Sequence, residues 1–146
     1  MLSFQKANKL KILLQVFITL ILLFSVSFAD QYTEVRKISL KKDQQKKILV
    51  KYENKVKLFT FRWTLYVNDA LVILRSYDDQ VAQNVLKLNH KNQSFRVEVK
   101  PRGANNFNVP YILVKFKEFD HEKHEAKFEV YNFSNNVQVS LEELKN

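Results

Sequence analysis

Two histidines and three carboxylates within six residues are the part of this sequence best equipped to bind a metal ion. They occupy residues 120–125, DHEKHE. Imidazole nitrogen and carboxylate oxygen are ordinary ligands of Zn²⁺, so His121 and His124 form the candidate metal pair. Side chains three residues apart share one face of a helix, but at a hairpin tip they diverge unless the turn folds them together. The competing interpretation is an exposed polar turn between two strands, and no cofactor is predicted.

The loop from Pro101 to Pro110 is a second candidate, because it holds the only glycine and both prolines of the chain. Loops carried by a rigid scaffold often form binding surfaces. Arg102 could contact an anionic group. Phe107 is an apolar ring in an Asn-rich segment, so it either folds back onto the core, contributing roughly 1.5–3 kcal/mol, or contacts a partner. These two residues form the candidate partner-binding loop.

Lysines gather between Arg36 and Lys57 in a chain of net charge +9. A positive field of this kind attracts anionic lipid head groups, cell-wall polymers or nucleic acid. The candidate anion-binding face consists of Lys37, Lys41, Lys42, Lys46, Lys47 and Lys51. Nucleic acid is disfavoured as a partner, because arginine is scarce and the one aromatic residue in the run, Tyr52, is predicted to point inward. The competing interpretation is a solvated lysine surface with no partner.

Motifs of known enzyme classes are missing from the sequence. It has no G-x-S-x-G elbow and no H-E-x-x-H, and a single glycine rules out a glycine-rich phosphate loop. With no cysteine, the chain has neither a thiol nucleophile nor a disulfide, nor a site for a lipid anchor. An active site assembled from distant strands would leave little local trace. The sequence therefore favours a non-catalytic protein without excluding an enzyme.

The elements that must position these residues are β-strands. Alternation from Val56 to Val67 predicts a half-buried strand. Its expected buried face consists of Phe59, Phe61, Trp63, Leu65 and Val67. Asn68 and Asp69 then precede a second apolar run, Ala70–Tyr77, and both residue types tolerate positive φ. The pattern predicts a tight hairpin turn at these two residues.

Further short strands follow from the same alternation, with a charged turn at 41–47 and a polar turn at 120–125. The predicted strands are Lys37–Leu40, Ile48–Tyr52, Val81–Leu88, Phe95–Val99, Tyr111–Phe119, Ala126–Phe133 and Val137–Leu141. The Val81–Leu88 segment also fits a helical period in part. No βαβ alternation appears, so we expect an all-β fold, a single immunoglobulin-like antiparallel β-sandwich of about eight or nine strands.

An apolar segment near the start predicts the destination of the chain. Three lysines precede the run Ile12–Ala29, which ends with small residues at Ser27 and Ala29. This is the pattern of a secretory signal peptide, so we expect residues 1–29 to be cleaved and residues 30–146 to form one exported domain. The alternative is an uncleaved inner-membrane anchor, with residues 12–29 as the only membrane contact. A cysteine-free composition rich in Lys, Asn, Ile and Phe favours a bacterial periplasm.

Together these observations predict an exported, non-catalytic module of a bacterial cell envelope. We expect it to bind or assemble with an envelope protein, because an open sheet edge can accept another strand by β-augmentation. The alternative function is an anion-binding module held against lipid or cell-wall polymer by the lysine-rich face. A metal carrier using His121 and His124 is the least favoured hypothesis.

Overall fold

The computed structural model describes Gln15 and residues 32–104, 108–135 and 137–145. The chain divides into two units, Met1–Asp30 and Gln31–Asn146, and every described strand belongs to the second unit. Apart from Gln15, the predicted leader lies outside the described residues, as does Phe107. Among the described residues, no helix has the length and apolar character needed to cross a membrane.

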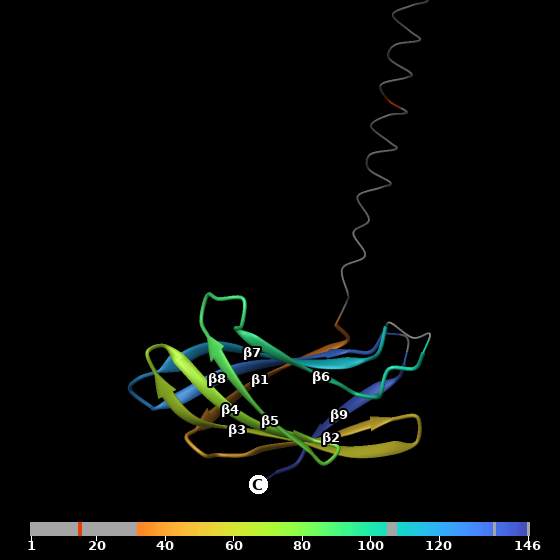
Figure 1. Cartoon of the computed structure of the whole chain (residues 1–146), viewed down its shortest axis with the longest axis horizontal. Helices are drawn as coiled ribbons and strands as arrows, with labels where there is room; N and C mark the ends of the chain where they lie inside the picture. Colours follow the sequence, from red (N-terminus) through yellow and green to blue (C-terminus); the bar gives the residue numbers. More distant parts are fainter. Residues whose placement is uncertain (1–14, 16–31, 105–107, 136, 146) are drawn as a thin grey trace, which may run out of the picture. The chain divides into compact units, whose positions relative to one another are not determined.

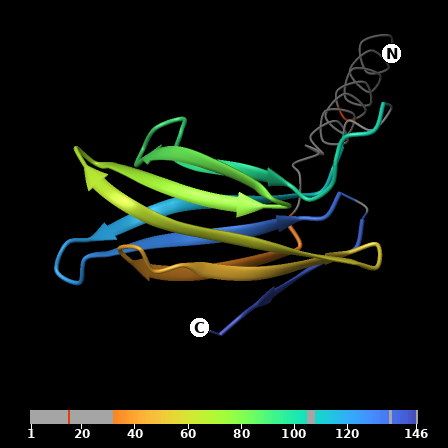
Figure 2. The ribbon, with the colours of Figure 1, turned by 60° about the horizontal axis from the view of Figure 1, so that its bottom comes forward.

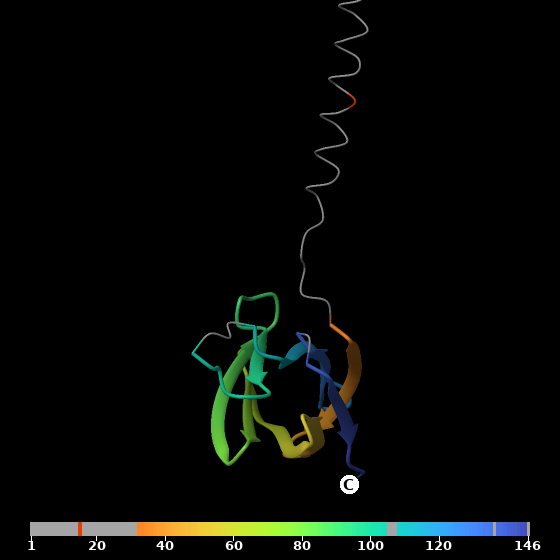
Figure 3. The same cartoon turned by 90° about the vertical axis from the view of Figure 1, so that its right-hand side faces the viewer.

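Two antiparallel sheets pack face to face as a β-sandwich (Figure 1). The strands are β1 (Glu34–Lys41), β2 (Lys46–Tyr52), β3 (Lys55–Val67), β4 (Ala70–Tyr77), β5 (Gln80–Lys87), β6 (Ser94–Glu98), β7 (Tyr111–Asp120), β8 (Glu125–Phe133) and β9 (Val139–Glu143). One sheet has the order β1-β8-β7-β6 and the other the order β5-β4-β3-β2-β9. Seen from one end in Figure 3, the green strands β4 and β5 lie on one side and β1 and β9 on the other. The prediction of an all-β sandwich is confirmed.

The core lies between the two sheets, because alternation turns one side of each strand inward. Phe59 and Phe61 of β3 and Phe116 of β7 have no exposed surface, and Phe128 of β8 is 1% exposed. The rings of Phe61 and Phe128 meet edge to face across the sandwich, with centroids 5.5 Å apart. Such aromatic pairs contribute about 0.5–1.5 kcal/mol beyond the area they bury. The phenylalanines of the two sheets therefore form one continuous core.

Two-residue turns without glycine close the central hairpins. Asn68 and Asp69 have φ values of 50° and 60° between β3 and β4. Asp78 and Asp79, which form the turn between β4 and β5, have φ values of 52° and 61°. Paired positive φ values match the right-handed twist of the flanking strands. The predicted turn at Asn68 and Asp69 is confirmed.

The prediction for the second half of β3 is wrong. The register between β3 and β4 shifts between Trp63 and Leu65, which is the signature of a β-bulge. One extra residue reverses the inward and outward faces of everything that follows it. Leu65 and Val67 are therefore 50% and 48% exposed instead of buried, while Tyr66 packs against the core.

Candidate functional site

The outward face of the five-stranded sheet is unusually apolar. Nine side chains on this face, from β2 to β5, are exposed or half-buried, and we name them the apolar outer face. They are Leu49, Val56, Leu58, Leu65, Val67, Val72, Leu74, Val81 and Val85. Leu65, Val72 and Val85 are paired in register, so they lie side by side across three strands. Thr60, Arg62 and Ser76 lie between these three residues and much of the rest of the face. Exposed apolar surface that is shared by several strands marks interaction sites.

The outward face of the four-stranded sheet has the opposite character. Its charged side chains include Lys37, Arg96, Glu98, Lys115, Lys117, Glu118, Lys127 and Glu129. Several are paired, with Lys117 Nζ 3.2 Å from a Glu129 oxygen and Lys127 Nζ 3.1 Å from a Glu118 oxygen. Charge dominates this face, whereas the outward face of the other sheet mixes the nine apolar side chains with Lys47, Lys51, Arg62 and Lys87.

Strand β5 forms an open edge beside the apolar outer face, and Figure 2 shows it in green next to β4. Among the described residues β5 pairs with β4 and with no other strand. Its sequence, QVAQNVLK, contains one charge, Lys87, and no proline, and its register with β4 is unbroken. Val81 is 76% exposed, the highest value among the large apolar side chains that the structure describes. Natural sheets protect edges with charges, prolines or bulges, and β5 has almost none of these.

The other three edges in the described part of the chain are protected. β1 carries four charged side chains along its length. β6 and β9 have five residues each, and β9 ends in Glu142 and Glu143, both in ion pairs. Arg36 of β1 also donates a 2.5 Å hydrogen bond to the carbonyl of Leu141 in β9. The sandwich is thus closed on the β1–β9 side. At β5 it is open along Val81–Gln83, whereas Asn92 of the following loop bonds the Val85 carbonyl and the Lys87 amide.

A half-buried arginine supports β5 from inside the sandwich. Arg75 of β4 donates from Nε to Asn84 Oδ1 of β5 at 2.7 Å. Its guanidinium carbon lies 5.3 Å from the ring centroid of Phe95, and burial lowers the pKa of Arg75. Sequence reasoning missed this residue, because a charge on the inward side of a strand carries no distinctive local pattern.

His121 and His124 line one groove of about 460 Å³, between the β3–β4 and β7–β8 hairpins. The ring of Phe119 stacks on Tyr66 at 3.9 Å, and His121 packs edge-on against both, at 5.1 and 5.8 Å between centroids. In the described ranges, no group of three or more His, Cys, Asp or Glu residues is arranged to hold a metal ion. The structure therefore brings the two histidines to one groove but places His121 in an aromatic cluster.

The six lysines of the predicted anion-binding face do not lie on one surface. Lys37 points out of the four-stranded sheet, whereas Lys47 and Lys51 point out of the five-stranded sheet. Lys41 ends β1, and Lys42 lies in the turn that follows it. The positive charge is therefore divided between the two outward sides of the sandwich.

Two of these lysines already have carboxylate partners on β9. Lys46 is ion-paired with Glu143, and Lys51 with Glu142. The hydrogen bond from Lys51 lowers the pKa of Glu142. Their charge is therefore partly neutralised at short range.

The candidate loop is also internally paired. Arg102 Nε donates to Glu98 Oε1 at 2.9 Å, which lowers the pKa of Glu98 and raises that of Arg102. The pair is exposed, so it contributes little to stability. Phe107 lies outside the described residues, so its predicted role stays a prediction.

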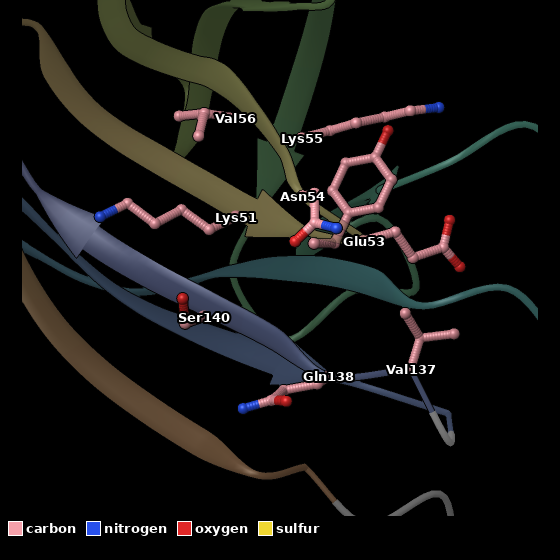
Figure 4. A pocket seen from close by; sticks show the side chains of 9 residues that line it. Lys51, Glu53, Asn54, Lys55, Val56, Val137, Gln138 and Ser140 are labelled. Carbon is pink, nitrogen blue, oxygen red and sulfur yellow. The ribbon is translucent and has the colours of Figure 1, made fainter.

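A second hollow, of about 560 Å³, lies between the β2–β3 turn and the β9 strand (Figure 4). Lys51 and Lys55 line it, and their ammonium groups point away from each other in Figure 4. Glu53 is turned toward Lys100, with 2.8 Å between Oε1 and Nζ. The polar groups do not converge, so the hollow offers no focus for a compact ligand.

Comparison of the chain with protein-family models, with curated proteins and with solved structures found no match. Sequence reasoning missed the apolar outer face, because it assigned Leu65 and Val67 to the core. The sequences of β4 and β5 did indicate an apolar outward face, because apolar residues occur at both odd and even positions of these strands.

Proposed function

We propose that this protein is an exported, non-catalytic β-sandwich of a bacterial cell envelope that acts as an interaction or assembly module. The observation that carries the proposal is the open β5 edge beside the apolar outer face. An added strand would gain main-chain hydrogen bonds from the edge and side-chain contacts from Val81 and Val85. Full burial of one such side chain is worth roughly 1.5–3 kcal/mol.

The destination of the domain belongs to the same proposal. The basic and apolar pattern of residues 1–29 and the absence of cysteine support export to a periplasm. The N-terminal residue of the protein isolated from cells tests this point. Asp30 would mean a freed domain, and Met1 would mean a domain tethered to the inner membrane.

The immunoglobulin-like type of the sandwich also stays a proposal. Two antiparallel sheets and three connections that cross between them support it. The immunoglobulin arrangement divides its strands as ABED and CFG. The unbroken β2–β5 meander differs from that arrangement, so the likeness is one of architecture.

Site-specific photocrosslinking in cells that make the full chain tests the interaction role. A photoreactive residue at Val81 is expected to give covalent adducts with a protein partner. The same residue at Lys115, on the charged face of the other sheet, is the matched control and is expected to give none. If position 81 yields no adduct, the interaction role is contradicted.

The alternative function, an anion-binding module, has the net charge of residues 30–146 in its favour, which is +6, since three of the lysines behind the +9 of the whole chain lie in residues 1–29. This alternative has less support than the interaction role at the β5 edge. The lysines are divided between two surfaces, and two of them are paired with glutamates. Binding to anionic vesicles that weakens as salt is added would favour this alternative, because salt screens exposed charges.

A further inference from the structure

The backbone groups that β5 leaves open can be assigned residue by residue. Asn92, in the loop after β5, donates from Nδ2 to the carbonyl of Val85, and its own carbonyl accepts from the amide of Lys87. In a strand the N–H and C=O of alternate residues point to the same side. The backbone N–H and C=O groups of Val81 and Gln83 therefore point away from β4, as those of Val85 and Lys87 do. Among the described residues, the backbone N–H and C=O groups of Val81 and Gln83 therefore have no hydrogen-bond partner.

We propose that this edge pairs with the β5 edge of a second copy of the same chain. The two strands run antiparallel about a two-fold axis at Gln83, so that the five-stranded sheets join into one. This inference rests on the proposed interaction role and names the partner. Gln83 of each copy exchanges both backbone hydrogen bonds with Gln83 of the other, as antiparallel residues directly opposite each other do.

The sequence of β5 is complementary to itself in this register. Val81 of one copy lies opposite Val85 of the other, so the most exposed apolar side chain of the edge is covered by another valine. The pairing runs from Val81 to Val85 and ends there, because the Lys87 amide of each copy is already bonded to the Asn92 carbonyl of its own chain. The carbonyl of Val85 has a second lone pair for the incoming amide of Val81, besides the one used by Asn92.

Other registers that keep the outward faces of the two copies on the same side no longer place Val81 opposite Val85. A shift by two residues in one direction puts Val81 opposite Lys87. A shift in the other direction puts Val85 opposite Asp79. Register is specified by side-chain pattern, so the pairing centred on Gln83 is the favoured one.

The symmetry of this contact closes the assembly at two copies. An isologous contact uses the same patch on both partners and leaves no second site for growth. It also aligns the apolar outer faces of the two copies along one continuous sheet. The charged side chains of the other three edges keep them from joining in the same way.

Charge substitution at the axis tests the register directly. Gln83→Lys and Gln83→Glu each place like charges opposite each other, and each is expected to weaken dimerisation roughly tenfold or more. An equimolar mixture of the two variants is expected to restore the dimer, because lysine then faces glutamate. Gln138→Lys, an exposed site preceding β9, is the control with the same charge change. The readout is sedimentation velocity over a concentration series, on protein purified from cells that make the full chain.

A concentration-dependent dimer that each single variant weakens and the mixture restores supports the inference. A wild-type protein that stays monomeric, or variants that dimerise like the wild type, overturns it. The photocrosslink at Val81 separates this failure from that of the proposed function. An adduct with the mass of another protein and no dimer would overturn the second-copy partner alone, and no adduct of any kind would overturn both.

Discussion

Trp63 of β3 donates a 2.7 Å hydrogen bond from its indole Nε1 to the main-chain carbonyl of Leu40 in β1. The two strands belong to different sheets, and both residues are buried. A buried carbonyl that loses its partner costs about 1–3 kcal/mol. This bond therefore ties the sheets together at the residue that immediately precedes the β3 bulge.

Trp63→Phe is expected to lower the free energy of unfolding by about 1–3 kcal/mol, because it leaves the Leu40 carbonyl without its donor. Guanidinium denaturation followed by far-UV circular dichroism measures the change, since the substitution removes the only tryptophan. Tyr66→Phe is the control. It removes an exposed 3.1 Å bond to Asp69 and is expected to change stability by less than about 0.5 kcal/mol. Equal losses in the two variants would contradict a special role for the Trp63 bond.

The bulge predicts that two leucines in the adjacent strands β3 and β4 respond differently to the same substitution. Leu71 has no exposed surface, whereas Leu65 is half-exposed. Leu71→Ala opens a cavity in the core and is expected to cost about 2–5 kcal/mol. Leu65→Ala removes surface side chain, so its expected change is within about 0.5 kcal/mol. Chemical denaturation of both variants gives the comparison, and a loss at Leu65 as large as that at Leu71 would mean that alternation continues through Thr64.

Most of the fold could be predicted because its strands are half-buried and alternate cleanly. Phe95 and Val97, for example, are buried where period two places them, between exposed or half-exposed neighbours. The turn at Asn68 and Asp69 was also predictable, because both residue types tolerate positive φ. These features depend on residues close together in sequence.

The bulge and the site could not be predicted in the same way, because they depend on how distant strands pair. Thr64 is an ordinary strand residue, and nothing in its neighbours indicates a register shift. The open edge is a property of strand order, which places β5 last in its sheet. The division of the lysines likewise follows from strand order, since Lys37 and Lys47 are ten residues apart but lie in different sheets.

Alkaline pH is expected to destabilise the domain through two tyrosines. Burial raises the pKa of Tyr77, whose hydroxyl donates a 2.7 Å bond to the carbonyl of Val99. The hydrogen bond to Glu129, together with burial, raises the pKa of Tyr131 to about 12. Both groups hold their protons more tightly in the folded state than at the ordinary pKa of 10.0. Their contribution is therefore complete below about pH 10 and is lost as the pH rises toward the folded values.

Denaturation curves measured on either side of this pH window check the effect. Tyr131→Phe is expected to flatten the alkaline loss, because it removes one of the groups that titrates. Lys91→Gln, at an exposed site in the β5–β6 loop, is the control for a change that leaves both tyrosines in place. An unchanged alkaline loss in Tyr131→Phe would assign the effect to other groups.

The histidine groove gives a prediction about metal. His121→Ala is expected to destabilise the domain by about 0.5–1.5 kcal/mol, because it removes the ring contacts with Tyr66 and Phe119. His124→Asn, at an exposed turn position with a φ of 51°, is the matched control and is expected to cost less, because asparagine tolerates positive φ. Neither value is expected to depend on added Zn²⁺. A zinc-induced rise in melting temperature that either substitution abolishes would revive the metal-carrier hypothesis.

The anion-binding alternative can be tested by removing the charge of single lysines. Lys47 has no ion pair among the described residues, whereas Lys46 is paired with Glu143. A lysine near an anionic membrane surface is worth about 1 kcal/mol, and a paired one offers less net charge to the surface. Lys47→Gln is therefore expected to weaken binding to vesicles containing anionic lipid more than Lys46→Gln does. Binding should also fall steeply with added salt, because exposed charges are screened. Vesicle co-sedimentation measures both effects, and binding that salt does not weaken would contradict an electrostatic contact and point to the apolar outer face instead.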